Sequence, residues 1–186
     1  RFFLLLMLAA GGASAGPIDA LQPMSFLAGH CWKGSIPATT STDEHCFEWV
    51  LNGHVLRDTH VMRTAGKPDY KGETTYYWSP IANSVEYLHL ENSGGMSRGT
   101  METVANTLYF PPAQDAAEAA SNGPVTYRVR WAPSSAKAFD AWAEKRGPDG
   151  TWQTMFKMTM TKTTPAVKAK KAVAKAKTKA RAKTRP

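Results

Sequence analysis

The stretch HCFEWVLNGHVLRDTHVM, residues 45–62, decides the fold, because it contains two alternating segments joined by Asn52-Gly53. Asn-Gly is the preferred pair for a two-residue type I′ hairpin turn, and such a turn fixes how the two strands align. The alignment places His45 opposite His60. Side chains on a strand alternate between two faces, so one face collects the large apolar groups and should point into the protein. That face carries His45, Phe47, Trp49, Leu51, His54, Leu56, Asp58, His60 and Met62.

The alternation of apolar and polar residues continues on both sides of this hairpin, between residues 30 and 162. Turn-forming residues interrupt it about every 8–12 residues, a spacing typical of short antiparallel strands. Strands are predicted at residues 30–36, 43–51, 54–63, 71–79, 84–91, 95–104, 106–111, 125–132, 137–145 and 151–161. This pattern favours an all-β fold, an antiparallel up-and-down barrel of about ten strands. The segment SFLAG, residues 25–29, predicts a short N-terminal helix before the first strand.

The N-terminal segment has the composition of a signal peptide. An apolar run at residues 2–10 is followed by Ala13-Ser14-Ala15, the small-x-small pattern of a signal-peptidase site. The run is too short to span a bilayer. We therefore expect cleavage after Ala15, a mature chain without a transmembrane segment, and a periplasmic or secreted location; a retained anchor is the alternative.

The C-terminal segment is strongly basic. Residues 162–186 contain ten Lys or Arg and no acid, so the formal net charge of +8 belongs to this segment. Such an Ala/Lys-rich composition cannot bury a core and predicts disorder. It would meet an anionic surface, namely lipid, lipopolysaccharide or nucleic acid; a solvated tail with no dedicated partner is the alternative. The expected organisation is a signal peptide at 1–15, a β-barrel domain at 16–162 and a disordered tail at 163–186.

The chain has two cysteines, Cys31 and Cys46, each preceded by a histidine. Two cysteines in an exported chain are usually paired, which predicts a disulfide between them. A His-Cys dipeptide on a strand sends its two side chains to opposite faces, so the two dipeptides are poorly arranged for a Cys₂His₂ zinc site.

Four polar residues of the predicted interior face could carry chemistry: His30, His45, Asp58 and His60. Three imidazoles and a carboxylate suit a first-row metal ion or a general base. The alternative is that these side chains lie at the barrel rim, hydrogen-bonded or hydrated. The sequence has no G-x-S-x-G elbow, no phosphate loop, no dinucleotide fingerprint and no H-E-x-x-H, so a binding protein is expected rather than an enzyme.

A barrel of ten strands has more interior than its side chains fill, which predicts a cavity for one small molecule. We expect the cavity wall to include Trp32, Trp49, Tyr77 and Trp78. Arg98 is predicted to face inward and to anchor the head group of a bound ligand, or else to pair with an internal acid.

Three segments carry a resemblance to a known group: FLAGHCWKG (26–34), GETTYYWSP (72–80) and VEYLHLENSGGMSRGT (85–100). They resemble the nitrobindin-like and fatty-acid-binding-like barrels of the calycin superfamily. The resemblance implies a ten-stranded up-and-down barrel with an internal ligand cavity. Haem-bearing members take their axial histidine from near the C-terminus, whereas the last histidine here is His89. The resemblance therefore does not extend to haem, and the cofactor is left unknown.

These observations together predict an exported, disulfide-linked barrel that binds a small hydrophobic or amphipathic ligand and is held at anionic surfaces by its basic tail. Two alternatives stay open. One is a metal-binding protein or metal-dependent enzyme that uses the inward histidines. The other is a tail-driven nucleic-acid or envelope-binding protein whose barrel is a scaffold.

Overall fold

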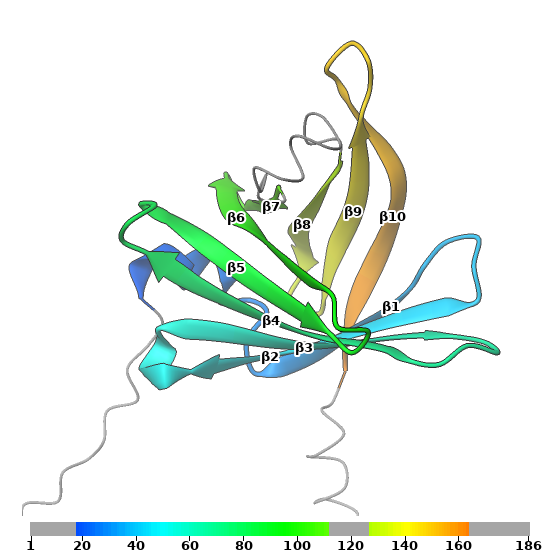
Figure 1. The fold of residues 1–186 in the computed structure, drawn as a ribbon, viewed down its shortest axis with the longest axis horizontal. Helices are drawn as coiled ribbons and strands as arrows, with labels where there is room; N and C mark the ends of the chain where they lie inside the picture. The colour runs from blue at the N-terminus through cyan, green and yellow to red at the C-terminus, as the bar shows by residue number, and fades with distance from the viewer. Residues whose placement is uncertain (1–17, 112–126, 164–186) are drawn as a thin grey trace, which may run out of the picture.

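The computed structural model describes residues 18–111 and 127–163, which form a closed antiparallel barrel (Figure 1). Its ten strands are β1 (His30–Ser35), β2 (Ser41–Val50), β3 (Val55–Thr64), β4 (Tyr70–Ser79), β5 (Ser84–Glu91), β6 (Met96–Val104), β7 (Thr107–Phe110), β8 (Tyr127–Ser135), β9 (Ala138–Arg146) and β10 (Trp152–Thr163). Each strand pairs with its neighbours in the chain, and β1 closes against β10. The predicted all-β, up-and-down barrel is confirmed, and its architecture is compatible with the calycin resemblance.

The two end segments singled out in the sequence fall outside the described residues. These are residues 1–15, the predicted signal peptide, and residues 164–186, which make up nearly all of the predicted tail. Within the part of the chain that is described, no helix has the length and hydropathy needed to cross a membrane.

The β2–β3 hairpin has the register that the Asn-Gly turn predicts. His45 is the partner of His60, and the ladder runs on to Val50 and Val55. Asn52 adopts φ 57° and ψ 34°, and the following glycine has φ 85°. Leu51 also has a positive φ, of 49°, and the connection from Val50 to Val55 spans four residues rather than the predicted two. Leu51 and His54, predicted to face inward, are exposed. The register of the ladder beyond this turn (η2, Leu51–Gly53) sets which face of the hairpin points inward.

The predicted disulfide between Cys31 and Cys46 is present. The two residues are direct partners across β1 and β2, with their Cα atoms 4.0 Å apart. Because faces alternate along a strand, the bond lies on the face opposite to Trp32 and His45. It joins the two strands behind the barrel interior.

The N-terminal helical segment differs from the prediction. Residues 25–29 form turns, and the short helix is the 3₁₀ helix η1 (Asp19–Met24), earlier in the chain. Pro23 within it has no N–H to contribute to an α-helical ladder. Gly29 has φ 75°, a left-handed conformation that does not continue a helix.

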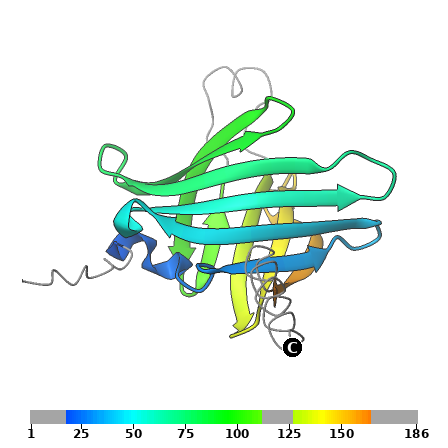
Figure 2. The ribbon, with the colours of Figure 1, turned by 90° about the horizontal axis from the view of Figure 1, so that it is seen from below.

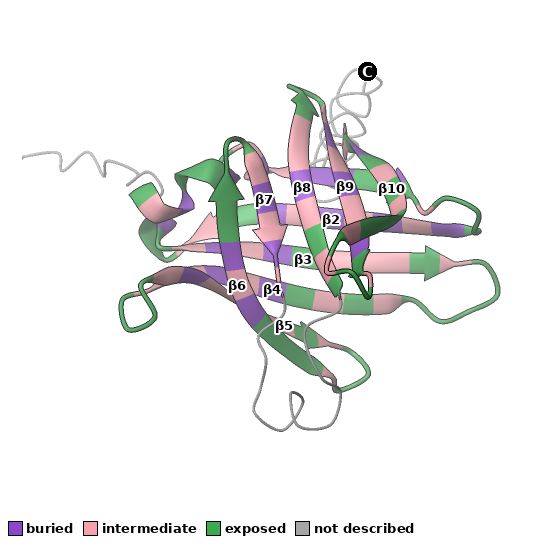
Figure 3. Cartoon of the chain, turned by 90° about the horizontal axis from the view of Figure 1, so that it is seen from above, coloured by how far each residue is buried: buried purple, intermediate pink, exposed green. Residues whose placement is uncertain are grey.

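The η1 helix lies at one end of the barrel (Figure 2), and the N-terminal segment that contains it contributes to the apolar core. Leu21, Met24 and Leu27 from this N-terminal segment are fully buried. The Trp32 indole N–H donates a hydrogen bond to the carbonyl of Leu27 at 3.0 Å, and the ring packs against Phe139. Along strands such as β2 and β9, buried and less buried residues alternate, as expected when one face points inward (Figure 3). The η1 segment therefore closes one end of the barrel.

Candidate functional site

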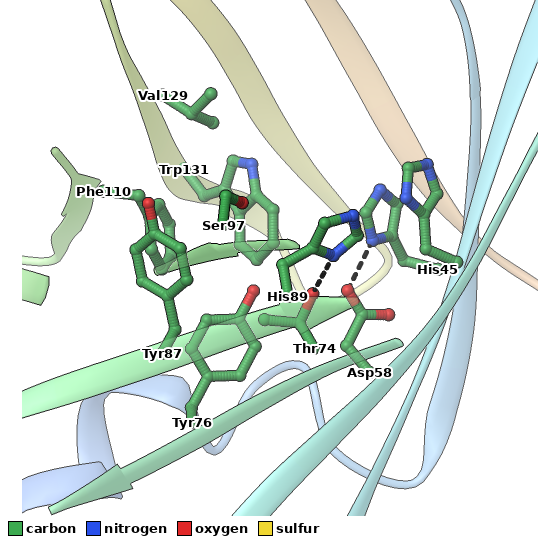
Figure 4. A pocket seen from close by; sticks show the side chains of 11 residues that line it. His45, Asp58, Thr74, Tyr76, Tyr87, His89, Ser97, Phe110, Val129 and Trp131 are labelled. Atoms are coloured by element: carbon green, nitrogen blue, oxygen red, sulfur yellow. Dashed lines mark hydrogen bonds and ion pairs between the residues drawn. The ribbon is translucent and has the colours of Figure 1, made fainter. Parts of the chain in front are cut away.

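A cavity of about 200 Å³ lies inside the barrel, against the apolar core (Figure 4). Its apolar and aromatic wall is made by Tyr76, Tyr87, Phe110, Val129 and Trp131. Its polar lining is made by His45, Asp58, His60, Thr74, His89 and Ser97. Two of these residues, Ser97 and Val129, are exposed, so the cavity reaches the surface beside them.

The aromatic wall is a continuous set of ring contacts. The rings of Phe110 and Trp131 have centroids 4.6 Å apart, and Tyr76 packs against Phe110 at 5.8 Å. Burial raises the pKa of Tyr76 well above its ordinary value, and burial also raises the pKa of Tyr87. Both phenols are therefore neutral at physiological pH, and they offer the cavity a flat apolar surface with hydroxyl groups.

His45 lies between two buried carboxylates. Its Nδ1 is 2.7 Å from Asp58 Oδ2, and its Nε2 is 3.3 Å from Asp43 Oδ2. Burial alone would lower the pKa of His45, but the charges and hydrogen bonds of Asp58 and Asp43 raise it to about 10. With nothing else bound, the imidazole therefore carries a positive charge between two negative ones.

His60 and Asp43 form a buried ion pair whose geometry is poor for a hydrogen bond. His60 Nε2 is 2.6 Å from Asp43 Oδ1, but the two atoms are not well aligned. Neither atom has a hydrogen-bond partner among the described residues, and the same holds for Asp58 Oδ1. Burial would raise the pKa of Asp43, yet the imidazoles of His45 and His60 hold it below its usual range. Three buried polar atoms at one end of the cavity thus lack a well-formed hydrogen bond, and Asp58 Oδ1 is the one of them that is in no ion pair given for the described residues.

His89 has two hydroxyl partners on β4. Its Nε2 is 2.8 Å from the Tyr70 hydroxyl, and its Nδ1 is 2.8 Å from Thr74 Oγ1. Burial lowers the pKa of His89, and the nearby imidazole of His60 lowers it further. This ring is therefore neutral at physiological pH, with one nitrogen donating a hydrogen bond and the other accepting one.

The structure brings together three of the four residues predicted as metal ligands. His45, Asp58 and His60 line the cavity, on β2 and β3. His30 points to the same side of β1 as Trp32, with ring centroids 6.3 Å apart, and does not line the cavity. The inward face predicted from the Asn-Gly turn is the reason the other three meet.

None of the five residues predicted to bind a ligand lines the cavity. Trp32 is 1% exposed and belongs to the apolar core, and Trp49 and Trp78 are partly buried against that core. Tyr77 alternates with the inward Tyr76, so it faces outward, where its hydroxyl donates to Glu86 at 3.1 Å.

Arg98 is exposed on the outer face of β6, so the predicted inward position is corrected. The inward residues of this strand are its neighbours Ser97, Gly99 and Met101. A Cβ at Gly99 would lie 2.6 Å from the hydroxyl oxygen of Tyr87, so only a glycine fits beside that ring. The pairing of β5 with β6 thus excludes Arg98 from the interior.

Two important residues of the site were missed from the sequence. Asp43 lies two residues before His45 on the same strand, so the period of two that selected His45 would also have selected it. His89 depends on the pairing of β4 with β5, which brings it opposite Thr74. No turn signal as strong as Asn-Gly marks that pairing.

No protein-family model matches this chain, and no curated protein shows significant similarity to it.

Proposed function

We propose that the protein is a binding barrel for one small amphipathic molecule, held in the cavity between the aromatic wall and the histidine-aspartate end. The observation that carries this proposal is the combination of an aromatic cavity with a buried, unpartnered acceptor, Asp58 Oδ1. A buried polar atom without a partner is costly, and a ligand that satisfies it gains the corresponding free energy.

The size of the cavity limits the ligand to about one ring. A cavity of roughly 150 Å³ is known to hold benzene, so the 200 Å³ here suits a ligand of roughly ten non-hydrogen atoms. The four aromatic side chains offer stacking and edge contacts to such a ring. A long-chain fatty acid would not be enclosed by this volume.

The polar end determines which functional group the ligand carries. Asp58 Oδ1 can only accept a hydrogen bond while the carboxylate is ionised, so its ligand partner is a donor such as a hydroxyl or amine. The class proposed is therefore a single-ring alcohol, phenol or amine.

We further propose that the mature protein is exported and that its basic tail holds it near an anionic surface. The Cys31–Cys46 bond supports export, because cytosolic thiols are normally kept reduced. The tail's excess of Lys and Arg supports electrostatic binding to lipid, lipopolysaccharide or nucleic acid.

The cavity proposal is tested with two probes that differ in one group, 4-fluorophenol and fluorobenzene, by ¹⁹F NMR line broadening. Both rings should bind, and 4-fluorophenol should bind more tightly because its hydroxyl reaches Asp58. Val129→Trp should abolish the broadening of both probes, because the indole occupies the mouth. Lys71→Phe, an exposed outer-face control, should change neither. Broadening that survives Val129→Trp would place the probes outside the cavity and refute the proposal.

A further inference from the structure

We infer that Asp43, His45 and His60 bind a divalent first-row transition ion at the polar end of the cavity. Asp58 acts beside them by orienting His45. The inference does not depend on the proposed organic ligand, since all the donor atoms belong to this chain.

The donor atoms of the three residues already converge. One ligand atom from each lies within 4.8 Å of the others. His45 Nε2 and Asp43 Oδ2 are 3.3 Å apart, close to the roughly 3.4 Å that separates two ligands at ~2.1 Å from a tetrahedral ion. This pair therefore needs almost no movement to share an ion.

The approach of His60 to Asp43 suits a shared cation. The His60 Nε2 and the Asp43 Oδ1 form an ion pair at 2.6 Å, although neither atom makes a well-aligned hydrogen bond. An ion held by both atoms would open this distance by less than about 1 Å and satisfy both. The rings of His45 and His60 are nearly parallel, at 9° with centroids 4.2 Å apart, so binding would tilt them towards the shared ion.

Asp58 provides the partner that metal-binding histidines usually have. It is 1% exposed, and its Oδ2 is 2.7 Å from His45 Nδ1 (Figure 4). A proton on Nδ1 leaves the Nε2 lone pair free to point at the ion, and a carboxylate that accepts from Nδ1 strengthens the ligand. Asp43 and Asp58 together bring two negative charges, which a divalent ion balances in this buried setting.

The donor set indicates the class of ion. Two imidazoles and one carboxylate suit Zn²⁺ or Fe²⁺ better than Mg²⁺ or Ca²⁺, which prefer oxygen ligands. Three protein ligands leave at least one coordination position open. Because His45 and His60 line the cavity, that position faces the space where a small molecule would bind.

The test uses the full chain, freed of metal with a chelator and titrated with Co²⁺ as a spectroscopic probe for Zn²⁺. Visible d–d bands should rise to a 1:1 end point and disappear when Zn²⁺ is added. Asp43→Asn and His60→Gln should each abolish the bands, and Asp58→Asn should weaken binding about 10–100-fold. The control His54→Gln removes an exposed imidazole of the β2–β3 turn and should change nothing.

A second readout needs no variant, in case a substitution prevents folding. Zn²⁺ should protect His60 of the wild-type chain from diethyl pyrocarbonate, while the exposed His54 reacts at an unchanged rate. The inference is overturned if the wild-type chain shows neither 1:1 Co²⁺ bands nor Zn²⁺ protection from diethyl pyrocarbonate. It is also overturned if the bands persist in folded Asp43→Asn and His60→Gln variants. Binding of 4-fluorophenol is measured separately on metal-free protein, so failure of one proposal is distinguishable from failure of the other.

Discussion

His45 Nδ1 lies 2.7 Å from Asp58 Oδ2 across the β2–β3 hairpin, although the two residues are diagonal neighbours rather than direct partners. The direct partner of His45 is His60, whose ring stacks on it. One hairpin therefore supplies a stacked pair of imidazoles and the carboxylate that orients one of them. This local origin makes the polar end of the cavity dependent on a single turn.

Removing the Asp58 carboxylate should be strongly destabilising. In the metal-free protein, Asp58→Ala leaves the His45 imidazolium with one carboxylate in a buried site, and breaking such a pair costs about 3–5 kcal/mol. Urea denaturation of chelator-treated protein measures the loss. Glu48→Ala, which removes an exposed ion pair with Arg57, should cost less than about 1 kcal/mol. Equal losses in the two variants would contradict the buried-pair interpretation.

The stability of the protein should depend on the glycine at position 53 of the β2–β3 turn. Gly53 has φ 85°, and a side chain in left-handed conformation costs about 1–2 kcal/mol, so Gly53→Ala should lower the free energy of unfolding by that amount. Asn52→Gly keeps a residue that tolerates positive φ and should change stability by only a few tenths of a kcal/mol. Thermal unfolding followed by circular dichroism compares the two. A neutral Gly53→Ala would contradict the left-handed conformation of Gly53 as a constraint on the turn.

The disulfide should contribute measurably to stability. Closing the loop of 15 residues between Cys31 and Cys46 removes chain entropy from the unfolded state, at about 3 kcal/mol. The double variant Cys31→Ala/Cys46→Ala should therefore unfold at lower urea concentration than the oxidised wild type. Adding a reductant should lower the wild-type midpoint and leave that of the double variant unchanged. A reductant effect on the variant would point to another cause.

A buried carboxylate on the outer face should make stability depend on acid pH. Glu144 accepts hydrogen bonds of 2.7 Å from both Arg128 and Arg130. Burial would raise its pKa, but the two guanidinium groups lower it below the ordinary value. The stabilisation is therefore complete above the unfolded-state pKa near 4.5 and is lost as pH falls through the lower folded-state value.

The measurement compares wild type with Glu144→Gln between pH 7 and pH 2. At neutral pH the variant should be less stable by about 1.5–3 kcal/mol, and the difference should shrink below pH 4.5. Glu44→Gln, at a more exposed pair with Arg63, should show a smaller difference over the same range. A difference that stays constant with pH would exclude titration of Glu144 as its source.

Deleting residues 165–186 should remove binding to anionic vesicles and its steep dependence on salt, because nearly all of the excess positive charge lies there. The melting temperature of the barrel should be unchanged, since β10 ends at Thr163. Co-sedimentation with vesicles of mixed neutral and anionic lipid at two salt concentrations provides the test. Undiminished binding by the shortened chain would refute an electrostatic role for the tail.

Site residues could be predicted where a local sequence feature, such as a turn, fixes the alignment of two strands. The Asn-Gly turn aligned β2 with β3, so the inward placement of His45, Asp58 and His60 followed from the sequence. The disulfide followed from cysteine number and the expected compartment. The barrel followed from regular alternation, which needs no exact register.

The errors arose where the alternation is blurred. In β6 the inward residue at position 99 is a glycine, which has no apolar side chain to indicate the inward face. The sequence pattern therefore favoured an inward Arg98, which is wrong. In β4 the adjacent aromatics Tyr76, Tyr77 and Trp78 all suit a cavity wall, although successive residues must face opposite ways. Only the pairing of these strands with their neighbours, which is a property of the whole barrel, decides between the faces.

The closure of one end of the barrel by η1 has a kinetic consequence. Among the described residues that line the cavity, the exposed ones are Ser97 and Val129, so a molecule that enters beside them also leaves beside them. Association and dissociation then cross the same barrier in opposite directions. A side chain that narrows this passage without touching the bound molecule will slow both rates by the same factor and leave the equilibrium affinity unchanged, so residence time and affinity can vary independently in this barrel.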